Sequence, residues 1–359
     1  MAKNLKPLHE QTIVVTGASS GIGLATAQAA AHRGASIVLA ARNAEALEQI
    51  AKELRAEGAR VAICAADVGK EDDVERIAET AITEFGGFDT WVNCASVSDY
   101  GTLEDFGMDE HRRVFEVNYF GVLKGSLVAL DHLRSRGGGS IINVGSILSD
   151  RAMIMQGSYS ATKHAVRALT EELRMEIDRE RLPVSVTLIK PTGIHTPFPE
   201  HARNHMDEPP RVPQVVYGPE LVADAILFAA EHSRRQLYVG GNGFFISLMA
   251  RLFPRMTDRV METAMVPAQQ SPEDAGDPSM RDNLYTPKRD GEVEGTQDVF
   301  VRRQSLFLEA QKRPGVALAL GSGAAIALWA ASRRRKNPRP QTSKSRRLNA
   351  SAPSAGGRS

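Results

Sequence analysis

The chain has 359 residues, of which 42% are hydrophobic and 24% charged, and its formal net charge is +1. These ordinary values fit one large domain with an appendage, or two modest domains, and exclude a chain without a sizeable core. The N-terminal residues contain no apolar h-region of a secretory signal, so we expect the folded part in the cytosol. Cys64 and Cys94 lie in apolar runs without metal-ligand spacing. We therefore expect buried free thiols and no metal site.

Strand and helix patterns alternate through the first 190 residues. Runs rich in β-branched residues predict strands at 12–17, 35–42, 60–68, 88–96, 139–146 and 183–191. Helical spacing predicts helices at 23–34, 44–58 and 71–86. Strands separated by such helices form βαβ units, whose parallel sheet is covered on both faces. We therefore predict an α/β domain with a Rossmann-like doubly wound parallel sheet over residues 1–243.

The character of the sequence changes after residue 243. Residues 244–265 are apolar with interspersed arginines and predict a helical segment that Pro254 breaks or kinks. Residues 266–314 are rich in Pro, Asp, Gly and Gln and predict a flexible linker. Residues 315–332 carry no charge and form a candidate membrane helix, which precedes a basic, disordered tail at 333–359.

The uncharged run at 315–332 is at the short limit for a spanning helix, which needs about 17–25 residues. Basic residues flank both of its ends, so the positive-inside rule leaves its orientation open. We favour membrane association, spanning or interfacial, over a soluble or oligomer-packing helix, and residues 244–265 could support it. The tail after residue 332 contains nine Lys or Arg residues but no aromatic residue, so we expect no nucleic-acid partner.

A glycine-rich turn joins the first strand to the first helix. In "VVTGASSGIGLATA", Gly17, Gly21 and Gly23 permit a tight turn and let a pyrophosphate approach the backbone at the helix N-terminus. The spacing GxxxGxG differs from the more common GxGxxG, and such a turn also occurs for steric reasons alone. Its position at the first strand–helix junction favours a nucleotide site.

Six elements in order resemble the short-chain dehydrogenase/reductases over residues 11 to about 243. They are Thr16–Gly23, "VNCAS" (92–96), Asn118, Ser146, Tyr159 with Lys163, and "PTGIHTP" (191–197). The resemblance implies a hydride-transferring enzyme for a small-molecule alcohol or ketone, and a homodimer or homotetramer. The family's usual Asn-Asn-Ala-Gly is here Asn93-Cys94-Ala95-Ser96, a change that affects local packing more than catalysis.

Tyr159 and Lys163 are four residues apart, so they share a face of a helix. A neighbouring ammonium, helped by an oxidised nicotinamide, lowers the pKa of a phenol, which can then act as general acid and base. The resemblance implies that Ser146 orients the substrate oxygen and that Lys163 also reaches the ribose. It further implies that Asn118 holds a water that passes protons from Lys163 to solvent.

The residues that end the second strand predict the cofactor. NAD enzymes of this family usually place Asp there, whereas this chain has Ala41 and then Arg42, which suits a 2′-phosphate. We therefore expect NADP(H), with NAD(H) less favoured; alternatively, Arg42 only solvates the strand end. The full set of predicted cofactor-binding residues is Gly17, Ser19, Ser20, Gly21, Ile22, Gly23, Arg42, Asn43, Asp67, Val68, Asn93, Ala95, Tyr159, Lys163, Pro191, Gly193, Ile194 and Thr196. Of these, Asp67 resembles the family's adenine-contacting residue.

Met153, Ile154 and Met155 lie between Ser146 and Tyr159 and predict an apolar pocket wall for a lipophilic substrate. An equally weighted alternative is that they pack only against protein. The Pro-rich loop at 196–218 is placed as a lid. A different class of function, a catalytically silent NADP(H)-binding sensor or scaffold tethered to a membrane, is disfavoured because only catalysis requires Ser146, Tyr159, Lys163 and Asn118 together.

Overall fold

The computed structural model describes residues 5–213, 215–271 and 277–315. Its centre is a seven-stranded sheet in the order β11-β7-β6-β4-β1-β2-β3, in which every pair is parallel. The strands are β1 (Thr12–Thr16), β2 (Ser36–Ala41), β3 (Val61–Ala65), β4 (Thr90–Asn93), β6 (Gly139–Val144), β7 (Val184–Pro191) and β11 (Gln236–Val239). The predicted Rossmann-like fold is confirmed.

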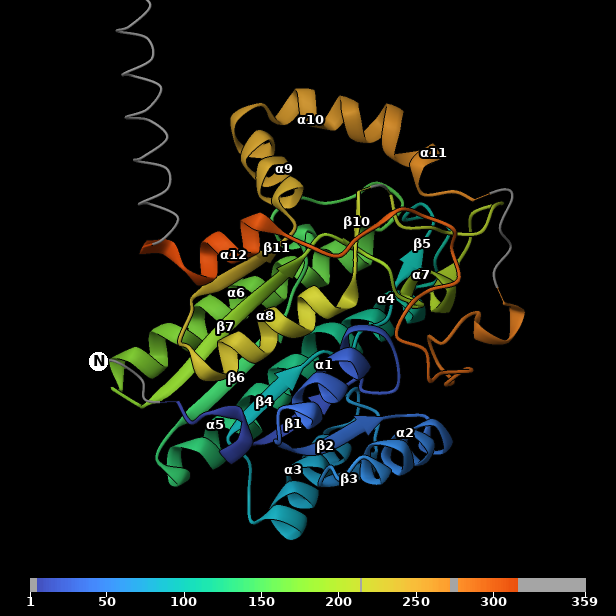
Figure 1. The fold of residues 1–359 in the computed structure, drawn as a ribbon. Helices are drawn as coiled ribbons and strands as arrows, with labels where there is room; N and C mark the ends of the chain where they lie inside the picture. Colours follow the sequence, from blue (N-terminus) through green and yellow to red (C-terminus); the bar gives the residue numbers. More distant parts are fainter. Residues whose placement is uncertain (1–4, 214, 272–276, 316–359) are drawn as a thin grey trace, which may run out of the picture. The chain divides into compact units, whose positions relative to one another are not determined.

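Helices cover both faces of this sheet (Figure 1). One face carries α1 (Gly21–His32), α2 (Ala44–Ala56) and α8 (Pro219–Glu231). The other carries α3 (Glu71–Phe85), α5 (Gly121–Arg136) and α6 (Gly157–Arg179). Successive strand residues point to opposite faces, so Val14 and Val15 are both fully buried but belong to different apolar clusters. Burial on both faces explains why the strands are continuously apolar.

Shorter elements surround the edge of the sheet where the strands end. They are β5 (Asp99–Tyr100), paired with β9 (Arg203–Asn204); α4 (Met108–Phe115), followed by a π-helical turn (Glu116–Phe120); a 3₁₀ turn (Ile147–Ser149); and β8 (Gly193–Ile194), α7 (Phe198–His201) and β10 (Val216–Tyr217). The carboxyl ends of parallel strands meet at this edge, which is where open α/β sheets bind ligands.

The segment predicted as helical at 244–265 forms α9 (Gly241–Leu252), α10 (Pro254–Val260) and a π-helical turn (Met261–Met265), followed by α11 (Val266–Ala268). The break falls at Phe253, directly before Pro254, as proline chemistry predicts. In Figure 1 these helices form an arm above the sheet.

The prediction of a flexible linker at 266–314 is wrong over its described part. Residues 301–302 form β12 (Val301–Arg302), which pairs with β10, and α12 (Leu306–Lys312) packs on β11. The side chain of Gln311 exchanges two hydrogen bonds with the backbone of Tyr238, at 2.9 and 3.0 Å. The compact unit therefore extends to Lys312 and not to residue 243, because isolated leucines such as Leu308, 1% exposed, anchor an otherwise polar segment.

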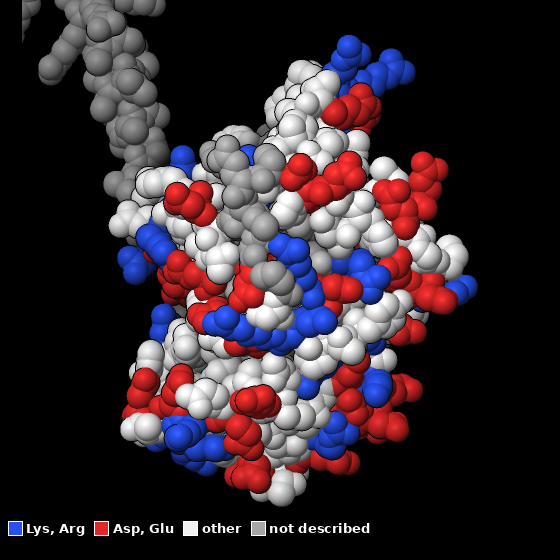
Figure 2. All heavy atoms as spheres, turned by 90° about the vertical axis from the view of Figure 1, so that its right-hand side faces the viewer, with Lys and Arg blue, Asp and Glu red and all other residues white. Residues whose placement is uncertain are grey.

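The candidate membrane helix at 315–332 and the basic tail at 333–359 lie, except for residue 315, outside the described residues, and they stay predictions. Within the described ranges, no helix is both long and apolar enough to cross a membrane. Figure 2 shows acidic and basic side chains interspersed over one face of the molecule, in agreement with the near-zero net charge.

Candidate active site

A cleft opens at the carboxyl ends of the strands, and most of the predicted site residues line it. Those that do are Gly17, Ser19, Ser20, Gly21, Ile22, Gly23, Arg42, Asn43, Asp67, Val68, Ala95, Ser146, Tyr159, Lys163, Pro191, Gly193, Ile194 and Thr196. They come from segments spread over almost 180 residues of sequence. The two predicted residues that do not line the cleft are Asn93 and Asn118.

The glycine-rich turn has no room for side chains at two of its positions. Gly17 has φ +70°, and a Cβ added there would lie 2.7 Å from the Cα of Ala95. A Cβ on Gly23 would lie 2.0 Å from the carbonyl oxygen of Gly17. The Thr16 hydroxyl oxygen accepts hydrogen bonds from the backbone of Cys94 (3.1 Å) and Ala95 (3.2 Å), which fixes the turn against β4. The N-terminus of α1 lines the cleft at the position predicted for a pyrophosphate. The N–H of its first residue, Gly21, donates to the carbonyl of Glu292 at 2.9 Å.

Ser146, Tyr159 and Lys163 converge on the same part of the cleft. Helix α6 places the Lys163 ammonium nitrogen 5.3 Å from the centroid of the Tyr159 ring, so the two side chains share a face. Lys163 is 3% exposed and donates a hydrogen bond of 3.1 Å to the carbonyl of Val144 at the end of β6. The arrangement brings a hydroxyl, a phenol and an ammonium to one surface.

Burial dominates the electrostatics of this group. Burial raises the pKa of Tyr159 above its ordinary value, although a hydrogen bond with Ser146 acts in the opposite direction. Burial also lowers the pKa of Lys163 to about 8. The predicted lowering of the phenol's pKa involves an oxidised nicotinamide bound beside Lys163, so it concerns the protein with its cofactor and stays a prediction. At neutral pH Tyr159 is a proton donor.

Asp99, a residue that the sequence did not single out, holds the N-terminal end of α6. Its carboxylate accepts a hydrogen bond of 3.1 Å from the backbone N–H of Tyr159, and the residue is 1% exposed. Burial raises the pKa of Asp99, while hydrogen bonds with Tyr159 and Ser158 act in the opposite direction. Asp99 thus positions the backbone that carries the phenol. Its partner is 60 residues away in sequence, so no local pattern could indicate the contact.

Asn93 and Asn118 face the interior. Asn93 Oδ1 accepts from the indole N–H of Trp91 (2.7 Å), and its Nδ2 donates to Asn143 (2.8 Å). Asn118 lies in the π-helical turn, where its amide exchanges hydrogen bonds of 2.8 and 2.9 Å with the backbone of Val97. Asn93 does not line the cleft, and its contact with the cofactor stays a prediction. Both amides brace the sheet edge, because protein groups engage their polar atoms.

The end of the cleft predicted to bind the adenosine contains Arg42, which follows β2, and Asp67. Arg113, which the sequence did not indicate, donates to a carboxylate oxygen of Asp67 at 2.6 Å. Burial lowers the pKa of Arg42; the charges of Asp67 and Asp290 act against this lowering, and that of Arg113 adds to it.

Among the described residues, no group of three or more His, Cys, Asp or Glu side chains could hold a metal ion.

The end of the cleft predicted to bind the substrate has both apolar and polar lining residues, with Gln156 and His201 among the polar ones. Of the three residues predicted to form its wall, only Met153 lines the cleft; Ile154 is 36% exposed, and Met155 packs against the cluster that contains Tyr100. Phe198 adds an aromatic wall, with its ring 5.5 Å from that of Tyr159. The predicted lid loop contributes this residue.

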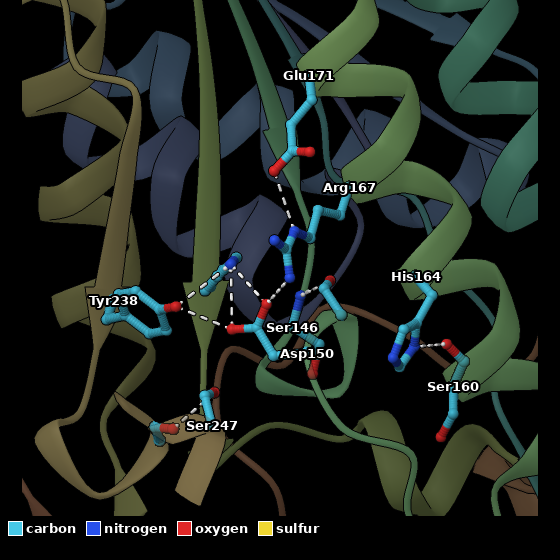
Figure 3. Close-up of polar contacts among 11 residues, drawn as sticks. Ser146, Asp150, Ser160, His164, Arg167, Glu171, Tyr238 and Ser247 are labelled. Carbon is cyan, nitrogen blue, oxygen red and sulfur yellow. Dashed lines mark hydrogen bonds and ion pairs between the residues drawn. The ribbon is translucent and has the colours of Figure 1, made fainter. Parts of the chain in front are cut away.

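A buried ionic network supports the turn that carries Ser146. Asp150, directly after this turn, accepts hydrogen bonds from Lys190 (2.9 and 3.1 Å), from the Tyr238 hydroxyl (2.8 Å) and from Arg167. Figure 3 shows the side chains of Arg167 and Tyr238 pointing toward Asp150, beside Ser146. His164, in contrast, bonds the carbonyl of Ser160 within α6 (2.9 Å), away from this network.

Comparison with known proteins identifies the family. The sequence profile described as "short chain dehydrogenase" matches residues 11–207. An uncharacterized oxidoreductase of Bacillus subtilis, YxnA, is 45% identical over 332 residues, which cover 92% of each chain. The similarity to YxnA thus extends well into the C-terminal part.

Solved structures give the same result. L-sorbose reductase from Gluconobacter frateurii, complexed with NADPH and L-sorbose, is 26% identical (TM-score 0.57; 67% of this chain and 98% of that one). A short-chain dehydrogenase/reductase from Burkholderia phymatum in complex with NAD is also 26% identical (TM-score 0.61; 75% and 99%). The chain belongs to the short-chain dehydrogenase/reductase family of oxidoreductases.

Proposed function

We propose that the protein is an NADP(H)-dependent oxidoreductase that transfers a hydride between the nicotinamide and a lipophilic alcohol or ketone. The observation that carries this proposal is the convergence of Ser146, Tyr159 and Lys163 on one cleft. Relatives of known structure hold NADPH in one case and NAD in another. The preference for NADP(H) is supported by Ala41 and Arg42 at the end of β2, where the strand itself offers a guanidinium and no carboxylate to the ribose.

The dinucleotide, when bound, would supply or accept the hydride. The glycine-rich turn would hold its pyrophosphate, and Arg42 its 2′-phosphate. In reduction, the phenol of Tyr159 donates its proton to the carbonyl oxygen as the carbonyl carbon becomes an alcohol carbon. Ser146 orients that oxygen with its hydroxyl, and the Lys163 ammonium stabilises the phenolate that remains. Because burial raises the pKa of Tyr159, the phenol carries its proton at neutral pH, as the reduction of a carbonyl requires.

The proposed substrate class depends on the walls beside Tyr159. Met153, Phe198 and Tyr100 line the cleft there and offer apolar or aromatic surface. A lipophilic ketone would bury its hydrocarbon against them. The proposal is therefore a reductase of apolar carbonyl compounds.

The test is the oxidation of NADPH and of NADH by the purified protein with a panel of apolar ketones and small polar carbonyl compounds. We expect turnover with NADPH, faster for the apolar ketones, and Arg42→Ala should reduce the preference for NADPH over NADH. Binding of dinucleotide without turnover of any carbonyl would instead favour the silent sensor or scaffold. Faster reaction of the polar compounds would refute the substrate class alone.

Two further properties are proposed from sequence. The family resemblance supports a homodimer or homotetramer, which light scattering of the purified protein would measure. The uncharged run at 315–332 supports membrane association, to be tested by fractionating the full-length protein beside a version that ends at Pro314. Equal solubility of the two would refute the anchor.

A further inference from the structure

Residues 282–292, here called the strap, contribute to the lining of the cleft at the end that contains Arg42 and Asp67. They lie beyond the matched family domain, which ends at residue 207. The strap pairs with the glycine-rich turn: Gly21 N–H donates to the Glu292 carbonyl, and Gly291 N–H donates to the Ser19 carbonyl, both at 2.9 Å. The amide of Asn43 donates to the Lys288 carbonyl at 3.0 Å. Three residues predicted to bind the cofactor are thus in direct contact with the strap.

Two guanidinium groups converge on the carbonyl oxygen of Leu284. Arg42 donates to it at 3.3 Å and Arg113 at 3.1 Å, and Arg42 also donates to the Asn283 carbonyl at 2.5 Å. Arg113 in turn holds the carboxylate of Asp67. The two guanidinium groups repel each other, and the carbonyl oxygen that both share as acceptor offsets part of this repulsion. The strap therefore orients Arg42 directly and Asp67 through Arg113.

Two residues of the strap, Leu284 and Asp282, fix it to the rest of the protein next to these hydrogen bonds. The side chain of Leu284 is fully buried, in an apolar cluster that includes Val97 and Val117 and borders Val68. Asp282 forms a two-pronged ion pair with Arg203, with both N–O distances 2.9 Å. Such anchoring lets the strap hold a defined conformation before any ligand arrives.

The strap also contributes surface to the cleft. Asn283, Pro287 and Asp290 line the same cleft as Gly17 and Arg42, so the strap does not fill the adenosine end but closes one side of it. The Asp290 side chain is 11% exposed. Its carboxylate lies 3.7 Å from Nε2 of His201 and, because the residue lines the cleft, would offer an acceptor for a hydroxyl group of the ligand.

We propose that the strap is a wall of the dinucleotide site: it holds Arg42 and Asp67 in place for the adenosine moiety and contacts that moiety through Asn283, Pro287 and Asp290. The inference rests on the proposed NADP(H) binding and adds residues that the family domain does not contain. The opposite arrangement, in which the strap competes with the dinucleotide for Arg42, predicts tighter binding when the strap is loosened.

Leu284→Ala tests the wall, with Leu306→Ala as the matched control, because Leu306 belongs to the same C-terminal extension but is 85% exposed. Fluorescence titration with NADPH should show a Kd at least about tenfold higher for Leu284→Ala, since the adenosine contacts are no longer preorganised, and an unchanged Kd for Leu306→Ala. An unchanged or lower Kd for Leu284→Ala would overturn the proposal.

Hydrogen–deuterium exchange of the wild-type protein gives a second test that needs no variant. Adding NADPH should slow amide exchange over residues 282–292 along with the glycine-rich turn, because a wall is closed by its ligand. Faster or unchanged exchange there, in protein that binds NADPH, would refute the strap alone. Wild-type protein that binds neither NADPH nor NADH would refute the proposed function, and the strap with it.

Discussion

Removing the Asp150 carboxylate should destabilise the protein strongly. Asp150 and Lys190 have side chains that are 0% and 1% exposed, and two N–O distances of 2.9 and 3.1 Å join them. Asp150→Ala leaves the Lys190 ammonium buried without its counter-charge. The loss for such a broken buried pair is about 3–5 kcal/mol of unfolding free energy. The Tyr238 hydroxyl, 2.8 Å from Asp150, loses its acceptor as well.

The same network predicts the pH dependence. Burial by itself raises the pKa of Asp150, but the hydrogen bonds and charge of Lys190 outweigh it, so the net pKa lies below the ordinary value. A carboxyl group with a lowered folded-state pKa contributes stability above its unfolded pKa of about 4, and this stability is lost as the pH falls through the folded pKa. The effect of Asp150→Ala should therefore shrink in acid.

Urea unfolding followed by circular dichroism is the assay. Asp109→Ala is the control, because Asp109 pairs with Arg112 at 2.7 Å but its side chain is 88% exposed, and exposed pairs contribute little. Adding Lys190→Met to Asp150→Ala should recover part of the loss, because the unpaired ammonium is then gone. A loss for Asp150→Ala no larger than that for Asp109→Ala would refute the reasoning.

Three further predictions concern the cleft. Gly23→Ala should abolish dinucleotide binding in a fluorescence titration, because its Cβ would lie 2.0 Å from the Gly17 carbonyl oxygen. Gly107→Ala is the control and should bind normally, because its Cβ would lie 3.9 Å from the nearest atom, a carboxylate oxygen of Glu110. Burial lowers the pKa of Lys163 to about 8, so Lys163→Met should unfold at a higher urea concentration than wild type at pH 7. This difference in the urea midpoint should narrow as the pH rises from 8 to about 10, because the buried lysine then loses its charge. A difference that stays constant with pH would contradict this. Burial raises the pKa of Cys94 to about 12, so iodoacetamide should leave it unmodified at neutral pH, and rapid alkylation would show that thiolate is present.

The sequence predicted the sheet and most of the cleft because the signals there are local. Apolar runs mark doubly buried strands such as β1 and β2. The four-residue spacing of Tyr159 and Lys163 requires only that their segment be a helix. Strand ends that share one edge then bring these residues to the glycine-rich turn.

Other features depend on contacts between distant segments. Asp99 reaches the backbone of Tyr159 across 60 residues, and the pKa of Tyr159 depends on how deeply the fold buries it. The strap was missed because one buried residue, Leu284, anchors a polar stretch that shows no periodicity. Residue type alone did not reveal that Asn93 turns toward the interior and away from the cofactor cleft.

The most direct test of the central claim is the rate of NADPH oxidation with an apolar ketone by Tyr159→Phe beside wild type, together with the Kd of NADPH for each. The variant keeps the aromatic ring but has no proton to donate. The account predicts a rate at least about a hundredfold lower with a Kd close to that of wild type. Equal rates for the two proteins would contradict it.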